Sequence, residues 1–340
     1  MKRAEDLRNL VLVSSTSNDS FARKIATYLE IPLCKTERTN FRDTDFKTRI
    51  GEGESVRGKD VYLIMTYYPP ISERLQELIV WTDALIGGSA DRVTLVLPFL
   101  FGSRQDRKTQ RGEPINVRAY INALKGVAQE HGSRIGFMTA DLHSEQLQTL
   151  AMYFDSLKAL PLFSAHIKSR YRNNDLAIVA PDTGGLKKAE ELAKLTNAAS
   201  FSWIAKTRPV DGEAIAYGIS GDNLFGKTAI VIDDMIDSGG TLVKACEALN
   251  SAGAKEIIVY ATHLLLTVPE NIQKINARIF CTDTIFHEPA KLSYLNIFSL
   301  PFSNVFAEAI KRKHLGLSTR ELYTEKVVDI CKYKQILFGH

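Results

Sequence analysis

Short runs of apolar residues alternate along the 340-residue chain with longer stretches whose apolar residues recur at helical spacing. The apolar runs predict strands at residues 10–13, 46–50, 61–65, 93–97, 135–139, 177–180 and 229–232. The periodic stretches predict a helix that ends near residue 29 and helices at 72–86, 186–195 and 242–249. Most of these strands lack polar alternates. Such strands, separated by helices, are typical of an α/β fold with mainly parallel sheets flanked by helices.

The strand at 229–232 runs into an acidic loop that contains glycines. The loop carries the carboxylates of Asp233, Asp234 and Asp237, followed by Ser238, Gly239, Gly240 and Thr241. Amides at the start of the next helix, beside glycines that let the backbone approach closely, suit a phosphate. The carboxylates suit sugar hydroxyls, or Mg²⁺, next to that phosphate. Acidic loops after strands are common, but this order of acids, hydroxyls and glycines favours a site for a phosphorylated ribose.

An internal repeat relates the two halves of the chain. Residues 83–96 align without a gap on residues 247–260, and the Gly-Lys pairs at 58–59 and 226–227 each precede a predicted strand. Such a match can arise by chance among strand–helix units, but the ungapped register favours a duplicated domain. The first copy carries Thr-Tyr-Tyr-Pro-Pro at 66–70, where the second copy has its acidic loop. The phosphorylated sugar is therefore expected in the second half.

Composition limits the class of protein. The length suggests two domains, and 45% hydrophobic with 24% charged residues is typical of a globular protein. The net charge of +4 is too small to indicate nucleic acid. The cysteines are scattered, without a Cys-x-x-Cys pair, which favours free thiols in a reducing, cytoplasmic compartment. No signal peptide or membrane-spanning run is expected, so we expect neither a membrane nor a nucleic-acid partner.

Polar segments follow three other predicted strands. Arg104, Gln105 and Asp106 follow one strand, where arginine suits a polyphosphate and Gln105 suits the edge of a base. A solvated basic loop, or one that binds nucleic acid, is the alternative, but no aromatic residues alternate with the basic ones. His143, two residues after Asp141, is a candidate partner of Mg²⁺ or phosphate. Asp182 is a second candidate metal ligand.

Taken together, these motifs resemble the ribose-phosphate diphosphokinases (PRPP synthetases). The acidic loop resembles their ribose phosphate loop. The resemblance extends to about residue 323 and includes Arg-Gln-Asp-Arg-Lys at 104–108, Asp-Leu-His-x-x-Gln at 141–146, Pro-Asp-x-Gly-Gly at 181–185 and Lys-x-Arg at 206–208. It implies two similar phosphoribosyltransferase-like domains, at 1–159 on the ATP side and at 160–340 on the ribose 5-phosphate side. It also implies transfer of the β,γ-diphosphoryl group of ATP to the 1-hydroxyl of ribose 5-phosphate.

The resemblance further implies roles for individual residues. Lys206 and Arg208 are implied as catalytic residues on a closing flap, and Mg²⁺ as a cofactor held by His143 and Asp182. ATP is implied to bind at Phe41, Asp43, Asp45, Arg104, Gln105, Asp106 and His143. Ribose 5-phosphate is implied to bind at Arg208, Asp233, Asp234, Asp237, Ser238, Gly239, Gly240 and Thr241. A homo-oligomer built from dimers, with a hexamer as one option, is also implied.

The chain departs from the family pattern in the hairpin that contacts adenine in a neighbouring subunit. Phe-Arg-Asp-Thr-Asp at 41–45 stands where the family has Phe-Ser-Asp-Gly-Glu, which is expected to alter the choice of nucleotide. Two alternatives to a synthetase are open. One is a non-catalytic homologue that regulates a true synthetase as a partner subunit, and the other is a phosphoribosyltransferase.

Overall fold

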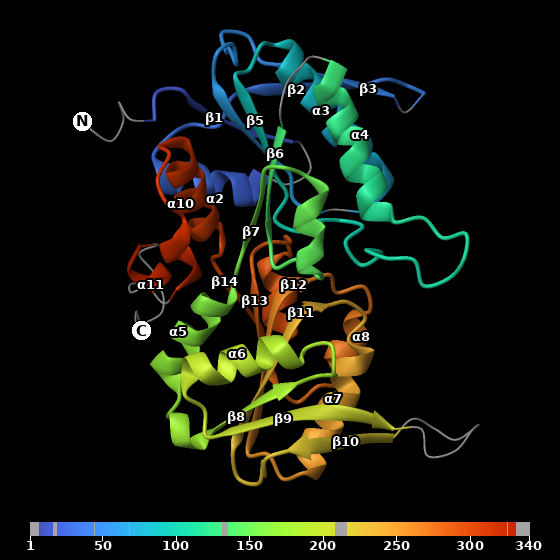
Figure 1. Cartoon of the computed structure of the whole chain (residues 1–340), viewed down its shortest axis with the longest axis vertical. Coiled ribbons are helices and arrows are strands. Elements are labelled where there is room, and N and C mark those ends of the chain that lie inside the picture. The colour runs from blue at the N-terminus through green and yellow to red at the C-terminus, as the bar shows by residue number, and fades with distance from the viewer. Residues whose placement is uncertain are drawn as a thin grey trace. The chain divides into compact units, whose positions relative to one another are not determined.

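The computed structural model describes residues 7–15, 19–43, 45–67, 69–130, 135–207, 216–324 and 326–330. The chain forms two compact units (Figure 1). Unit 1 contains Met1–Lys158, Thr284–Phe286 and Phe302–Leu322, and unit 2 contains Ala159–Asp283, His287–Pro301 and Tyr323–His340. The predicted domains were continuous, at 1–159 and 160–340. In the structure the main break lies after Lys158, but two later segments belong to unit 1.

Unit 1 is built on a parallel sheet in the order β1-β4-β5-β6-β7. Its strands are β1 (Leu10–Ser14), β4 (Asp60–Ile64), β5 (Arg92–Val96), β6 (Ile135–Ala140) and β7 (Phe154–Leu157), and its helices are α2 (Asp19–Leu29), α3 (Ile71–Gly87), α4 (Asn116–Glu130) and α10 (Ser303–His314). The predicted strands of this sheet and the helix at 72–86 are confirmed, and β7 is an addition. A separate antiparallel hairpin pairs β2 (Thr36–Asn40) with β3 (Phe46–Ile50).

The segment Phe302–Leu322 returns to unit 1 through α10. This helix packs against α2, where the rings of Phe21 and Phe306 meet edge to face at 5.3 Å. At its last residue, His314 Nδ1 lies 2.7 Å from Asp60 Oδ2. Asp60 is buried and also accepts a hydrogen bond from Arg92 Nε at 2.7 Å. These contacts join the end of the chain to the amino-terminal edge of the sheet, because Asp60 and Arg92 begin β4 and β5.

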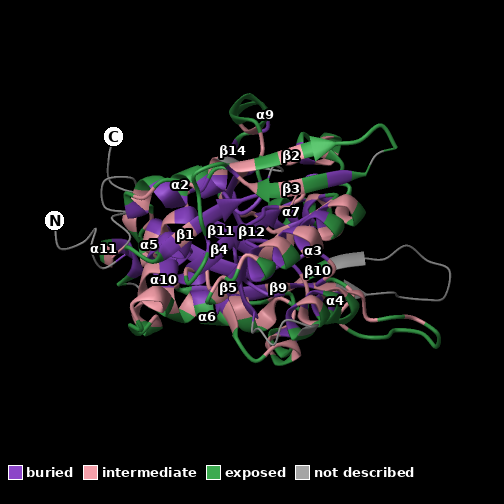
Figure 2. Cartoon of the chain, turned by 90° about the horizontal axis from the view of Figure 1, so that it is seen from above, coloured by how far each residue is buried: buried purple, intermediate pink, exposed green. Residues whose placement is uncertain are grey.

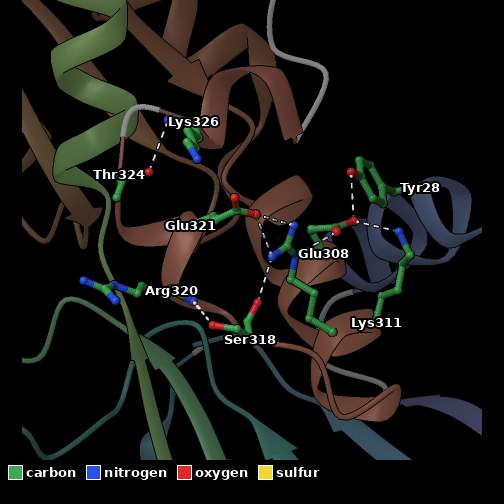
Figure 3. Close-up of polar contacts among 9 residues, drawn as sticks. Tyr28, Glu308, Lys311, Ser318, Arg320, Glu321, Thr324 and Lys326 are labelled. Atoms are coloured by element: carbon green, nitrogen blue, oxygen red, sulfur yellow. Dashed lines mark hydrogen bonds and ion pairs between the residues drawn. The ribbon is translucent and has the colours of Figure 1, made fainter.

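Buried charge also organises the end of α10 (Figure 3). Glu308 is buried and accepts hydrogen bonds from Tyr28 OH at 3.4 Å and from Lys311 Nζ at 3.2 Å. Arg312 Nη1 donates to the backbone oxygen of Ser318 at 2.7 Å and to Glu321 at 3.2 Å. A buried carboxylate is stable only when it is paired, so these contacts hold α10 against α2 and hold the segment after α10 against that helix.

Unit 2 is built on a sheet in the order β10-β9-β8-β11-β12-β13-β14, in which the strands are parallel except for β10, which pairs antiparallel with β9. Its strands are β8 (Leu176–Ala180), β9 (Ser200–Thr207), β10 (Ala216–Gly221), β11 (Thr228–Ile236), β12 (Glu256–Leu264), β13 (Arg278–Thr282) and β14 (Ile297–Leu300). Its helices are α5 (Leu160–Arg170), α6 (Leu186–Thr196), α7 (Gly240–Ser251), α8 (Pro269–Ile272), α9 (Pro289–Tyr294) and α11 (Val327–Ile330). Short 3₁₀ helices at Glu145–Leu150, Asn173–Asp175 and Arg320–Tyr323 complete the described elements. In the described part of the chain, no helix is long and apolar enough to cross a membrane.

The internal repeat is confirmed at the level of single hydrogen bonds. Gly58 N donates to Ser89 O and Gly226 N donates to Gly253 O, both at 2.9 Å. Asp91 N and Lys255 N bond in the same way to the carbonyls of residues 59 and 227, at 2.9 and 2.8 Å. In both copies the strand after the Gly-Lys pair lies parallel to the strand after the helix, with Asp60 opposite Arg92 and Thr228 opposite Glu256. The two halves therefore repeat one strand–helix–strand unit.

A buried histidine lies in the core of unit 2. Arg170 Nε donates to His166 Nε2 at 2.9 Å, so the proton of the neutral ring is on Nδ1, which lies 2.7 Å from Tyr260 OH. The ring also packs on Phe280, with centroids 4.6 Å apart. Burial, and then the positive charges of Arg170 and Arg278, lower the pKa of His166 from 6.5 to about 4. The folded protein therefore holds this ring neutral at pH values where the unfolded chain binds a proton.

We expect this histidine to make unit 2 less stable in mild acid. Between pH 6.5 and about 4, only the unfolded chain protonates His166, so the free energy of unfolding decreases as the pH falls, by up to ~1.4 kcal/mol per pH unit. Urea unfolding of the wild type and of His166→Gln, which does not titrate, measures this contribution as the difference between the two curves. Parallel curves over that range would contradict the assignment.

Candidate functional site

Strand β11 carries the acidic residues further along the sheet than the sequence predicts. The strand was expected to end at residue 232, with the acids in a loop, but it continues to Ile236 and pairs with β12 as far as Leu264. Its pairing with β8 stops earlier, at Val231 opposite Val179. Asp233 and Asp234 therefore lie on the end of a strand that keeps a hydrogen-bonded neighbour only on the β12 side.

The turn from β11 into α7 matches the predicted phosphate loop. Gly239 has φ of 75° and precedes the first residue of α7, Gly240, and no side chain caps the helix. A Cβ on Gly239 would lie 2.8 Å from Ile272 Cδ1, whereas one on Gly240 would meet only Ser238 Oγ, at 3.8 Å. The amides of the first turn of α7 have no partner within the helix, so they suit an anion.

Thr267, between β12 and α8, and Asn271, within α8, support this turn. Thr267 Oγ1 donates to Asp237 Oδ1 at 2.7 Å, and Asn271 Nδ2 donates to the backbone oxygen of Ser238 at 2.8 Å. The backbone also contributes, since Thr267 N donates to Asp237 O at 3.2 Å. One oxygen of Asp237 thus helps to fix the turn, a structural role beside its predicted role in sugar binding.

The Asp233 and Asp234 carboxyls interact strongly with each other. Burial, followed by the charge of Asp234 and a hydrogen bond between the two carboxyls, raises the pKa of Asp233 to about 8, although the backbone amide of Asp234 and the charge of Lys188 oppose the rise. Asp233 Oδ1 also accepts a hydrogen bond from Asp234 N at 2.8 Å. A pair that readily shares a proton can both donate hydrogen bonds to sugar hydroxyls and accept them.

Asp182 and Lys206 lie at the same edge of the unit 2 sheet as the acidic strand end. Asp182 follows β8, and its Oδ1 accepts hydrogen bonds from the amides of Gly184 and Gly185, at 2.9 and 3.1 Å, which closes the turn before α6. Lys206 lies on β9, beyond the last pair that β9 makes with β8, Trp203 opposite Ala180. The predicted flap was expected to begin at Lys206, but this residue still pairs with Tyr217 of β10. Arg208 and the rest of the predicted flap lie outside the described residues.

In unit 1, the candidate ATP residues at 104–106 and His143 follow neighbouring strands. The ends of β5 and β6 are joined by hydrogen bonds from Leu97 N to Met138 O, at 2.8 Å, and from Ala140 N to Pro98 O, at 3.1 Å. Arg104 and His143 are exposed, and Gln105 and Asp106 are partly exposed. Asp141 is buried and has φ of 31°, a conformation that is rare without glycine. The structure therefore brings these residues to one edge of the sheet.

The remaining candidate ATP residues lie on the tip of the β2–β3 hairpin. The Phe41 side chain is 48% exposed, and Asp43 and Asp45 are exposed. Figure 2 shows the hairpin strands mostly as exposed or partly exposed. Arg38, in the middle of β2, connects the hairpin to α3: its guanidinium carbon lies 4.2 Å from the centroid of the Phe46 ring, and it pairs with Glu73 of α3 at 3.2 Å. The tip is thus presented outward from unit 1, on a strand pair outside its main sheet.

The predicted metal ligands His143 and Asp182 belong to different units. Among the described residues, no group of three or more His, Cys, Asp or Glu side chains is arranged to hold a metal. Mg²⁺ is usually held by one or two protein ligands together with water and substrate phosphates. A carboxylate such as Asp182, at the edge that carries the phosphate turn, fits that donor chemistry. The pairing of His143 with Asp182 stays a prediction.

Comparison with known proteins identifies relatives over most of the chain. Residues 10–127 match the N-terminal domain of ribose phosphate pyrophosphokinase, and residues 156–295 match the phosphoribosyl transferase domain. A ribose-phosphate pyrophosphokinase from Maricaulis maris is 36% identical over 305 residues, which is 88% of this chain and 96% of that protein. The enzyme from Chlorobaculum tepidum is 35% identical over 323 residues, 94% of this chain and 96% of that protein.

A solved structure is similar as well. The phosphoribosylpyrophosphate synthetase from Mycobacterium smegmatis superimposes with a TM-score of 0.81 at 29% identity, over 90% of this chain and 98% of that chain. The predicted α/β fold with two phosphoribosyltransferase-like domains is thereby confirmed.

Sequence reasoning missed the residues that support the site. Thr267 and Asn271 lie in a mixed polar and apolar stretch with no periodic signal, and Lys188 is one of two consecutive lysines in an ordinary helix. A Thr-x-x-x-Asn spacing that runs into a short helix is not distinctive. Only the fold places these side chains below the phosphate turn and the acidic strand end.

We expect the turn to require glycine at position 239 but not at 240. Gly239→Ala places a Cβ at positive φ and against Ile272. Gly240→Ala places a better helix former at the first position of α7. Gly239→Ala should lower the free energy of unfolding by ~1–2 kcal/mol more than the matched Gly240→Ala, measured by urea denaturation without ligand. Equal losses for the two variants would show that the turn geometry is not constrained as described.

Proposed function

The chain belongs to the ribose-phosphate pyrophosphokinase family, and from this premise we propose the reaction and the roles of its residues. The protein transfers the β,γ-diphosphoryl group of ATP to the 1-hydroxyl of ribose 5-phosphate, which gives PRPP and AMP. The observation that carries this proposal in the structure is the β11–α7 turn, where uncapped helix amides and the acidic strand end lie next to each other. A sugar phosphate offers the matching anion and hydroxyls.

Ribose 5-phosphate is held by one continuous segment of unit 2. Its phosphate accepts hydrogen bonds from the backbone amides of Gly239 and Gly240, and the hydroxyl of Thr241 adds a donor. Its hydroxyls bond to the carboxyls of Asp233 and Asp234. The support from Thr267 and Asn271 means that the turn is formed before the ligand arrives, which reduces the entropy lost on binding.

ATP is bound mainly by unit 1. The guanidinium of Arg104 and the imidazole of His143 suit phosphate oxygens, and Gln105 suits the edge of adenine. These side chains follow the adjacent strands β5 and β6, so one ligand can reach all of them. Phe41, Asp43 and Asp45 serve the ATP site of a neighbouring subunit in a homo-oligomer.

In the reaction, the 1-hydroxyl oxygen attacks the β-phosphorus, and the bond from that phosphorus to the AMP oxygen breaks. Positioning and charge neutralisation supply most of the acceleration in phosphoryl transfer. Lys206 and Arg208 supply positive charge to the diphosphoryl group that is being transferred. Asp182 and His143, the predicted ligands, would hold Mg²⁺ together with the substrate phosphates, and the cation would neutralise charge on the ATP phosphates. We place this chemistry in the cytoplasm, on the sequence argument from scattered cysteines.

The phosphoribosyltransferase alternative leaves residues 10–127 without a role, although they match the N-terminal domain of the pyrophosphokinases. The second alternative, a non-catalytic partner subunit, is separated from an enzyme by assay. Pure protein is incubated with ATP, Mg²⁺ and ribose 5-phosphate, and AMP and PRPP are quantified. Equal amounts of the two products support the proposal, and no AMP from correctly folded protein would overturn it.

We expect Lys206→Ala to lower kcat on the order of 10²-fold while KM for ribose 5-phosphate stays nearly unchanged. The charge is needed mainly as the diphosphoryl group loosens, so its loss affects the transition state more than the bound substrate. Initial rates at saturating ATP measure both constants. The control is Lys255→Ala, which removes an exposed lysine at the amino-terminal ends of the unit 2 strands. A raised KM with unchanged kcat would contradict the assignment of Lys206.

We also expect the hairpin to act between subunits. Phe41→Ala should raise KM for ATP without changing KM for ribose 5-phosphate, and light scattering should give the mass of an oligomer for the wild type. Phe225→Ala, which removes another exposed ring, 76% accessible and located in unit 2, is the matched control. A fully active monomer would refute this part of the proposal.

A further inference from the structure

Lys188 of α6 lies beneath the acidic end of β11. Its Nζ donates to the backbone oxygen of Asp233 at 3.2 Å and to Thr262 Oγ1 of β12 at 3.4 Å. Thr262 is fully buried and Lys188 is half-buried. The ammonium group is thus held between two adjacent strands by two partners on the fixed framework of the sheet.

This position matters because β11 loses one neighbour just before Asp233. The β8 pairing ends at Val231, while β12 continues beside the strand as far as Leu264. A strand end with a partner on one side only is free to shift unless another group holds it. Lys188 supplies such a contact at the residue where the carboxylates begin.

The ammonium group also compensates charge. Asp233 and Asp234 are neighbours on the same strand and both are half-buried, and a partly buried pair of like charges is unfavourable without a nearby cation. The charge of Lys188 lowers the pKa of Asp233, as does the backbone amide of Asp234, and the contact of Lys188 with the Asp233 backbone agrees with this influence. Asp182, after β8, adds a further negative charge at the same edge of the sheet.

We propose that Lys188 is a positioning residue of the ribose subsite, which holds the end of β11 and compensates its charge so that Asp233 and Asp234 are ready to bond to sugar hydroxyls. The inference rests on the proposed function, because it assigns the carboxylates to ribose 5-phosphate. According to this proposal, the hydroxyl contacts of the site depend on Lys188 and the phosphate contacts do not. Lys188 supports the hydroxyl contacts of Asp233 and Asp234, and the amides of α7 bind the phosphate without it.

Titration calorimetry of the full chain with two probes, ribose 5-phosphate and inorganic phosphate, tests this separation. Lys188→Gln should weaken ribose 5-phosphate binding on the order of tenfold and change phosphate binding less than about twofold. Lys188→Arg keeps the charge and should restore most of the affinity. Lys187→Gln removes the neighbouring exposed charge and should bind both probes like the wild type. If Lys188→Gln does not fold, Thr262→Val, which removes one anchor of the ammonium group, should act in the same direction.

A double-mutant cycle identifies the route of the effect. In an Asp233→Asn background, Lys188→Gln should weaken ribose 5-phosphate binding much less than it does alone, since the residue acts through that carboxyl. Equal loss for both probes, unchanged affinity in Lys188→Gln, or full additivity with Asp233→Asn would each overturn the inference and leave the proposed function standing. A wild type that does not bind ribose 5-phosphate would instead overturn the proposed function, and the inference with it.

Discussion

The unequal pairing of β11 is the constraint on which the site of unit 2 depends. The strand pairs with β8 only to Val231 but with β12 to Ile236, so its last residues project from the sheet while they remain anchored on one side. That extension carries Asp233 and Asp234 to the edge and sets the point at which the chain turns into α7. A shorter strand would leave the carboxyls on a loop, and a strand paired on both sides would have no unpaired backbone edge beside them.

Placing two carboxyls on such a strand end creates an electrostatic difficulty that other elements relieve. Helix α6 brings a cation beneath the strand through Lys188, and α7 brings the positive end of its backbone dipole through Gly239 and Gly240. Thr267, just before α8, and Asn271, within α8, fix the turn with side-chain hydrogen bonds. The acidic residues and the anion site therefore tolerate each other because each is supported by a different part of the fold.

Much of this arrangement follows from local sequence, and the exceptions have physical reasons. The apolar strands and the glycine turn were predictable, because burial on both faces and positive φ leave clear patterns in the sequence. Strand β2, Thr-Glu-Arg-Thr-Asn, was not, because every residue is polar and its stability comes from pairing with β3 and from the contact of Arg38 with α3. The extension of β11 was missed because consecutive carboxylates resemble a loop. The roles of Lys206, Arg208 and Asp182 rest on resemblance to the family.

The matched hydrogen bonds of the two repeats have a consequence for how the chain tolerates change. Gly58 and Gly226 share positive φ and have open space where a Cβ would be, and their amides bond to equivalent carbonyls. The amino-terminal edges of the two sheets thus share one hydrogen-bonded turn. The opposite edges have diverged, with Thr66 and Pro70 in one half and a phosphate turn in the other. Equivalent substitutions in the two halves can therefore be compared. Such a comparison separates the effect of a substitution on folding from its effect on ligand binding.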